Sequence, residues 1–206
     1  MFLIKKNNFK FFQIYLLLII IIFFNFELNA EENRGILKIG NENAKVTIKV
    51  FSSLTCPHCA NFHTKIFKKL KKELIDKGKV KYEHHGFPLD LAALNAEKVL
   101  GCVESKELKL NLLNDLYKNQ DSWASGPDIN SINQKLFNIS NKYGLNNDKN
   151  NNCLNDQILE DEILNVRING SKIYSIQATP TIFINEKKYK GQHNYMDFKK
   201  EILKFL

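Results

Sequence analysis

The order of hydrophobic and polar positions predicts strands and helices in succession. Residues 45–51 are rich in β-branched and aromatic side chains, which is typical of a β-strand. Residues 56–77 follow with apolar side chains at helical spacing, and Gly78 is a residue type that commonly ends a helix. Residues 80–86 again favour a strand. Residues 45–86 therefore predict a strand, a helix and a second strand.

Helical periodicity dominates the middle of the chain. Apolar positions recur at intervals of three and four residues and predict several helices between residues 89 and 170. The polar stretch 146–152 is interpreted as a surface loop, and Trp123 falls in a turn-rich stretch. Leu154 is expected to open the last of these helices. The block as a whole is predicted to be all-helical.

Strand patterning returns near the C-terminus. Residues 181–184 predict a strand, Asn185 and Glu186 a hairpin turn, and residues 187–190 the returning strand. Residues 195–205 have the apolar spacing of a closing helix. The mixture of strands and helices predicts the α/β fold class.

The N-terminal segment has the order of a secretory signal peptide. Three lysines precede an apolar run at residues 14–24, and the segment ends at the small residue Ala30. The apolar run is short for a membrane span, although an uncleaved anchor is the alternative. In either case we expect the folded part to lie outside the cytosol, in the periplasm, where disulfides persist.

The net charge of the chain does not by itself indicate a binding partner. The formal net charge is +8, which is compatible with a nucleic-acid or anionic membrane partner. However, the densest group of basic residues occupies the polar face of the predicted helix 56–77, which is typical of a solvated helix face. These residues are Lys65, Lys68, Lys69, Lys71 and Lys72. No recognition motif accompanies them, so we expect no nucleic-acid partner.

Cys56-Pro57-His58-Cys59 lies where the first strand meets its helix. A helix start carries unpaired N–H groups and partial positive charge, which favour a thiolate, the reactive form of cysteine. Pro57 suits the first helical position, and His58 can add positive charge beside the sulfurs. The placement predicts a redox pair, with Cys56 as the nucleophile and Cys59 as the less accessible resolving thiol. A structural zinc half-site and a buried thiol pair are the alternatives.

This motif after a strand, with Ala178-Thr179-Pro180-Thr181 far downstream, resembles the DsbA-like thiol–disulfide oxidoreductases of the thioredoxin superfamily. The resemblance covers nearly all of the chain beyond the signal segment. It implies a thioredoxin fold with an inserted all-helical domain. The implied divisions are a signal peptide at 1–30, an N-terminal arm at 31–43, a thioredoxin-like domain at 44–88 and 171–206, and the insertion at 89–170.

The resemblance also implies that Thr179 and Pro180 are joined by a cis peptide bond and face the dithiol. The backbone of Thr179 would then pair with an extended substrate. One position departs from the family, because thioredoxins and many DsbA-like proteins carry a buried carboxylate where this chain has Val50. Lys49 and Glu83 are nearby in strand terms, but the sequence assigns neither as a substitute.

The second pair of cysteines lies in the helical block. Four cysteines allow three pairings, and pairing Cys56 with Cys59 leaves Cys102 and Cys153 for each other. Some DsbA-like proteins resemble this chain in having a second, structural disulfide there. Such a bond would stabilise the fold by about 4 kcal/mol on the chain-entropy model. Two free buried thiols are the alternative.

The function that we expect is that of an exported protein thiol:disulfide oxidoreductase without a cofactor. It would act as a monomer, donate the Cys56–Cys59 disulfide to reduced exported proteins, and be reoxidised by a membrane partner. A disulfide isomerase or reductase on the same fold is the near alternative. From another class, a metal-binding protein would use both cysteines with His63, His84 or His85.

Overall fold

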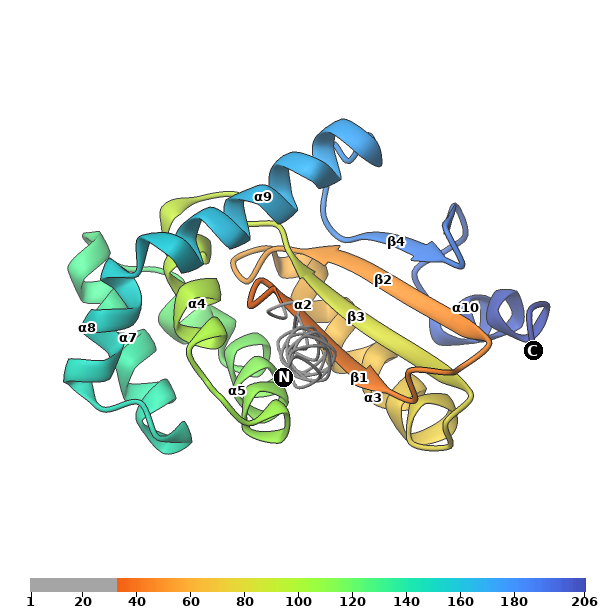
Figure 1. Cartoon of the computed structure of the whole chain (residues 1–206), viewed down its shortest axis with the longest axis horizontal. Helices are drawn as coiled ribbons and strands as arrows, with labels where there is room; N and C mark the ends of the chain where they lie inside the picture. The colour runs from red at the N-terminus through yellow and green to blue at the C-terminus, as the bar shows by residue number, and fades with distance from the viewer. Residues whose placement is uncertain (1–32) are drawn as a thin grey trace, which may run out of the picture. The chain divides into compact units, whose positions relative to one another are not determined.

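A five-stranded mixed sheet lies at the centre of residues 33–206, the part of the chain that the computed structural model describes (Figure 1). The strand order is β1-β3-β2-β4-β5. The expected signal peptide at 1–30 lies outside the described residues. Within residues 33–206, no helix is both long and apolar enough to cross a membrane.

The predicted strands form the middle of the sheet. β2 (Val46–Ser52) and β3 (Val80–Gly86) pair in parallel, and β4 (Thr181–Ile184) pairs antiparallel to β2. A turn with positive φ at both positions, 44° and 64°, leads into β5 (Lys187–Lys188). Such a two-residue turn fits the right-handed twist of a hairpin, as the sequence predicted.

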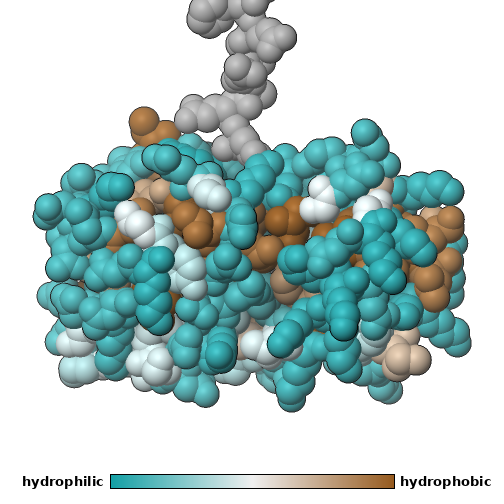
Figure 2. Space-filling model, turned by 90° about the horizontal axis from the view of Figure 1, so that it is seen from below, coloured by the Kyte–Doolittle hydropathy of each residue, from teal (hydrophilic) through white to brown (hydrophobic). Residues whose placement is uncertain are grey.

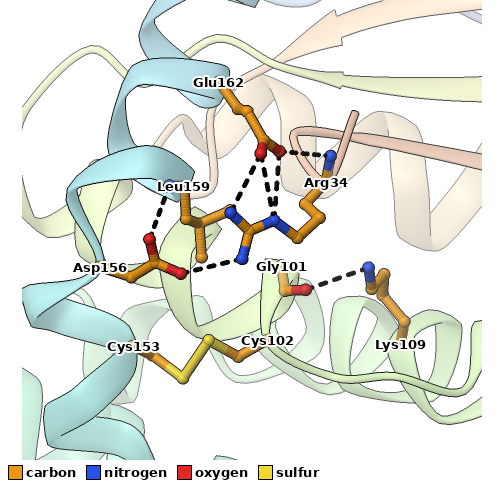
Figure 3. A network of polar contacts seen from close by, with 8 residues as sticks. All are labelled: Arg34, Gly101, Cys102, Lys109, Cys153, Asp156, Leu159 and Glu162. Carbon is orange, nitrogen blue, oxygen red and sulfur yellow. Dashed lines mark hydrogen bonds and ion pairs between the residues drawn. A yellow bond between two sulfur atoms is a disulfide. The ribbon is translucent and has the colours of Figure 1, made fainter. Parts of the chain in front are cut away.

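The edge strand β1 (Ile36–Gly40) pairs antiparallel with β3 and was not predicted from the sequence. The segment 31–43, which was expected to be an N-terminal arm, therefore contains an edge strand of the sheet. Arg34 holds the start of β1 against the helical block (Figure 3). Its guanidinium lies 2.8 Å from Asp156 and 3.0 Å from Glu162, and its backbone N–H also donates to Glu162.

The helix that follows the Cys-x-x-Cys motif is continuous but changes its winding. It consists of α2 (Pro57–Phe62), the π-helical turn His63–Phe67, α3 (Lys68–Leu70) and the π-helical turn Lys71–Ile75. Gly78 follows with a φ of +68°, the left-handed conformation that suits glycine at a helix end. Four of the five lysines on its polar face are exposed. Figure 2 shows a surface that is largely hydrophilic, with apolar residues in a broken band across its middle.

The block between β3 and β4 is all-helical, as predicted. Its helices are α4 (Leu91–Gly101), α5 (Lys106–Lys118), α6 (Gln120–Trp123), α7 (Ile129–Ser140), the 3-10 turn Asn141–Tyr143, α8 (Asn147–Asn155) and α9 (Gln157–Ile173). α9 packs against β3 and continues past residue 170, where we expected the insertion to end. The closing helix α10 (Tyr195–Leu203) follows β5, close to its predicted position.

Three local expectations in the helical block are wrong. Residues 146–152 are not a surface loop, because α8 begins after Asn146, whose side chain caps it by accepting from the Lys149 N–H. Leu154 consequently lies in the last turn of this helix rather than opening the next. Trp123 belongs to the short helix α6 and is fully buried, with its indole N–H donating to a backbone oxygen of α5.

The two faces of the sheet enclose different parts of the core. Val46, Ile48 and Val50 alternate along β2 and belong to the larger cluster, which continues through α2 and α3 into α5 and α7. Phe51 points to the opposite face and joins a smaller cluster with Val166 of α9. The Cys-x-x-Cys motif therefore lies over the Val50 side of the sheet.

Candidate active site

The Cys-x-x-Cys motif begins the helix as the sequence predicted. Cys56 is the N-cap residue of α2, with extended backbone angles of −82° and 119°, and Pro57 occupies the first helical turn. The backbone N–H groups of Cys59 and Ala60 donate to the Cys56 carbonyl oxygen at 3.0 and 3.1 Å. The Cys56 sulfur consequently lies at the positive end of the helix.

The two sulfurs differ in access to solvent. Both are free thiols; Cys56 is 9% exposed and Cys59 is fully buried. The Cys56 sulfur lies 3.4 Å from the carbonyl oxygen of Thr179. The Thr179–Pro180 bond is cis, as expected from the resemblance. The loop before β4 therefore faces the more accessible sulfur of the pair.

The surroundings of Cys56 favour its thiolate. Its pKa falls from the ordinary 9.0 to about 5, chiefly because the Cys59 thiol donates a hydrogen bond to it. Burial opposes this shift, and Thr179 and the backbone N–H groups of Cys59 and His58 reinforce it. A thiol with this pKa is ionised at neutral pH and is also a good leaving group.

The pKa of Cys59 moves in the opposite direction. Burial raises it well above the ordinary value, and the hydrogen bond that its thiol gives to Cys56 raises it further. The same pair of sulfurs thus holds one thiolate and one protonated thiol. The roles of Cys56 as nucleophile and Cys59 as resolving thiol stay predictions.

His58 is exposed beside the sulfurs, and its backbone N–H contributes to the low pKa of Cys56. The prediction from the sequence concerned the positive charge of the imidazole ring. The contribution of the ring stays a prediction, because the identified effect of residue 58 comes from the main chain.

The candidate metal ligands lie on two faces of the sheet. His84 faces the dithiol side, whereas His85 lies against Phe51, with ring centroids 4.6 Å apart. Each candidate histidine already has a polar partner. The ring of His63 lies 2.7 Å from Asn114, that of His84 lies 3.1 Å from Glu97, and that of His85 lies 2.9 Å from Glu83. No three His, Cys, Asp or Glu side chains within residues 33–206 converge as metal ligands. The metal-binding alternative therefore lacks a ligand set in this part of the chain.

The family's buried carboxylate has no replacement on the neighbouring strand positions. Val50 is fully buried, whereas Lys49 and Glu83 lie at alternate positions, toward the opposite face. Lys49 forms an ion pair with Glu186. Glu83 contacts Lys81 and His85, and these hydrogen bonds outweigh burial and lower its pKa to about 2.

A hydroxyl pair that the sequence analysis did not identify lies on the dithiol side instead. Ser52 Oγ and Tyr117 OH are 2.7 Å apart, and each residue is only 3% exposed. The residues are 65 positions apart in the chain. The strand alternation could have placed Ser52 on the same face as Val50, but no local signal connects it with Tyr117.

The second pair of cysteines forms a disulfide in the structure (Figure 3). It joins Cys102, just after α4, to Cys153 in α8, across a sequence separation of 51 residues. Figure 3 shows this bond near the contacts of Arg34 with Asp156 and Glu162. The disulfide therefore joins α4 to α8 within the helical block, close to the contacts that hold β1.

Comparison with known proteins identifies related sequences. A family model described as thioredoxin matches residues 32–204. Disulfide bond formation protein D of Bacillus subtilis is 30% identical over 177 residues, which cover 82% of this chain and 76% of that protein. A putative protein-disulfide oxidoreductase of Rickettsia typhi is 31% identical over 148 residues, covering 71% of this chain. The chain spans about half the length of this relative, 53%.

Among solved structures, the crystal structure of Wolbachia pipientis alpha-DsbA1 is similar, with a TM-score of 0.77 and 30% sequence identity. The match covers 82% of this chain and 90% of that one. The sheet order, the Cys-x-x-Cys helix and the facing cis-proline define a protein of the thioredoxin fold. The chain belongs to the thioredoxin superfamily and, within it, to the DsbA-like proteins.

Proposed function

We propose that this protein is an exported thiol:disulfide oxidoreductase that donates the Cys56–Cys59 disulfide to reduced substrate proteins. The observation that carries the proposal is the opposite shift of the two thiol pKa values, with that of Cys56 near 5 and that of Cys59 raised. A stabilised thiolate favours the reduced pair, and a pair that favours its reduced form is a strong oxidant. The names of the Bacillus and Rickettsia relatives support the same class of reaction.

The transfer takes place in two exchange steps. A substrate thiolate attacks the Cys56 sulfur, the Cys56–Cys59 bond breaks, and its electron pair stays on the Cys59 sulfur. A second substrate thiolate then attacks the substrate sulfur of the mixed disulfide and expels Cys56 as a thiolate. The substrate gains a disulfide and gives up two electrons and two protons. One proton is retained on Cys59, and the other passes to solvent because Cys56 stays ionised.

The loop at Thr179 supplies a place for an extended substrate. Its carbonyl oxygen lies 3.4 Å from the Cys56 sulfur, so a peptide segment aligned with this loop would pass over the reacting atom. We propose that reduced exported proteins bind in this manner and that a membrane partner reoxidises the pair. Disulfide isomerase or reductase activity is the competing function for the same site.

Oxidation of a reduced test protein distinguishes these functions. The oxidised chain is mixed with reduced ribonuclease and, separately, with ribonuclease that contains scrambled disulfides. Substrate disulfides formed in proportion to the loss of Cys56–Cys59 would support the proposal, and a Cys56→Ser variant provides the inactive control. Rescue of scrambled ribonuclease without oxidation of the reduced protein would favour the isomerase function.

Export has its own test. Mass spectrometry of the protein recovered from its native compartment should show a chain that begins at Glu31, after cleavage following Ala30. A chain that retains residues 1–30 would favour a membrane anchor.

A further inference from the structure

The Ser52–Tyr117 hydroxyl pair is placed to act on the buried sulfur. Ser52 ends β2 two residues after Val50, so strand alternation directs both side chains toward α2 and α5. The Ser52 and Thr179 side chains both hydrogen-bond the Cys59 sulfur and lower the pKa of that thiol, against the larger effects of burial and of Cys56. The Tyr117 hydroxyl meets Ser52 from α5 at 2.7 Å. A hydroxyl from the strand, hydrogen-bonded to a hydroxyl from the helix, therefore borders Cys59.

The first exchange step places a negative charge at this position. When the substrate thiolate bonds to Cys56, the leaving sulfur of Cys59 takes the electron pair of the broken bond. Cys59 is fully buried, and an ionised group without a partner in such surroundings is costly. Hydrogen bonds to an ionised acceptor are stronger than those between neutral groups, so a hydroxyl donor would favour the leaving thiolate.

The other ionisable groups around this sulfur do not replace the hydroxyl pair. Burial raises the pKa of Tyr82 of β3 and of Tyr117, and the nearby charge of Cys59 raises both pKa values further. Both phenols therefore stay protonated. Glu97 raises the pKa of Tyr117 further, and its carboxylate lies 3.1 Å from the His84 ring. The carboxylate is thus paired with a histidine on β3.

We propose that Ser52 donates a hydrogen bond to the Cys59 thiolate as it leaves the disulfide, and that Tyr117 is the positioning residue for the Ser52 hydroxyl. The hydroxyl pair would stabilise the thiolate of the buried Cys59 in a chain that has valine, and not the family's carboxylate, at position 50. Neither hydroxyl loses its proton in this role, because the proton that Cys59 finally retains comes from the substrate thiols. The inference rests on the proposed oxidase function, because it concerns the first step of that exchange.

The test is the single-turnover reduction of the oxidised chain by a peptide with two thiols, at neutral pH. Loss of one hydrogen bond to a charged group slows such a step by about tenfold or more, which is the reduction expected for Ser52→Ala. Ser52→Thr keeps the hydroxyl and should restore most of the rate. Tyr117→Phe keeps the ring but not its hydroxyl, and should slow the step by a smaller factor, about threefold.

Ser140→Ala is the matched control, because Ser140 is also fully buried and its hydroxyl bonds Asn150 in the helical block. It should lower stability but leave the exchange rate unchanged. An unchanged rate in Ser52→Ala would overturn the inference, as would equal slowing in Ser140→Ala. If Ser52→Ala fails to fold, a normal rate in Tyr117→Phe overturns it instead. A wild-type chain that does not oxidise the peptide at all would instead refute the proposed function.

Discussion

The ionisation of Cys56 should make the stability of the reduced protein depend on pH. Its pKa is about 5 in the folded chain and ordinarily 9.0. Because folding lowers this pKa, the contribution is complete above about pH 9 and is lost as the pH falls through about 5. At about pH 7 the gain is roughly two pKa units at about 1.4 kcal/mol each. We take about 2 kcal/mol, because the sulfur is partly open to solvent and its interactions are screened.

The perturbation is the substitution Cys56→Ser, which removes the ionising group and keeps a small polar side chain. Reduced wild-type and variant proteins are unfolded with denaturant at about pH 4 and at about pH 7. The free energy of unfolding of the wild type, relative to the variant, should rise by about 2 kcal/mol between these values. Oxidised wild type is the control, because its disulfide does not titrate. If the free energies of unfolding of wild type and variant differ by the same amount at both pH values, the reasoning is refuted.

Three further predictions concern the disulfide, His58 and Arg34. Replacing Cys102 and Cys153 together by alanine should lower the free energy of unfolding by about 4 kcal/mol on the chain-entropy model. His58→Ala should raise the pKa of Cys56 and make the pair less oxidising, as measured by thiolate absorbance against pH and by glutathione equilibria. Arg34→Ala should lower the free energy of unfolding by about 1 kcal/mol, because it removes the ion pairs of two part-buried carboxylates, with Arg34→Lys intermediate.

Each of these predictions has a result that contradicts it. Equal alkylation of all four cysteines under mild reduction would remove the structural role of Cys102–Cys153. An unchanged titration of Cys56 in His58→Ala would leave the main-chain N–H as the only contribution of residue 58. Unfolding of Arg34→Ala at the wild-type denaturant concentration would show that the ion pairs of β1 contribute nothing measurable.

Local patterns in the sequence predicted much of the fold and the position of the dithiol site. The strand, helix and proline signals around Cys56 are short-range, because the residues that define the helix start are adjacent in sequence. The cis bond before Pro180 came from the family resemblance alone. α8 was missed because asparagine-rich segments favour turns over helices. The helix is stabilised by tertiary contacts, including the buried Asn150, which donates to Leu145 and bonds Ser140.

The remaining features depend on contacts between distant residues. β1 is short, and its place in the sheet is fixed by pairing with β3 and by Arg34, which contacts residues more than a hundred positions away. The Ser52–Tyr117 pair likewise joins a strand to a helix across 65 positions. Neither serine nor tyrosine is unusual in its own segment. Patterns within one segment cannot reveal such partners, because they register only the face on which a side chain lies.

The redox equilibrium of Cys56–Cys59 with glutathione tests the central claim most directly. The pair is equilibrated with mixtures of reduced and oxidised glutathione, trapped with acid, alkylated and quantified by mass. With a Cys56 pKa near 5, we expect a potential well above the value of about −270 mV that is typical of thioredoxin. A potential at or below that value would mean that the dithiol reduces its partners, and would contradict the proposal that this protein donates disulfides.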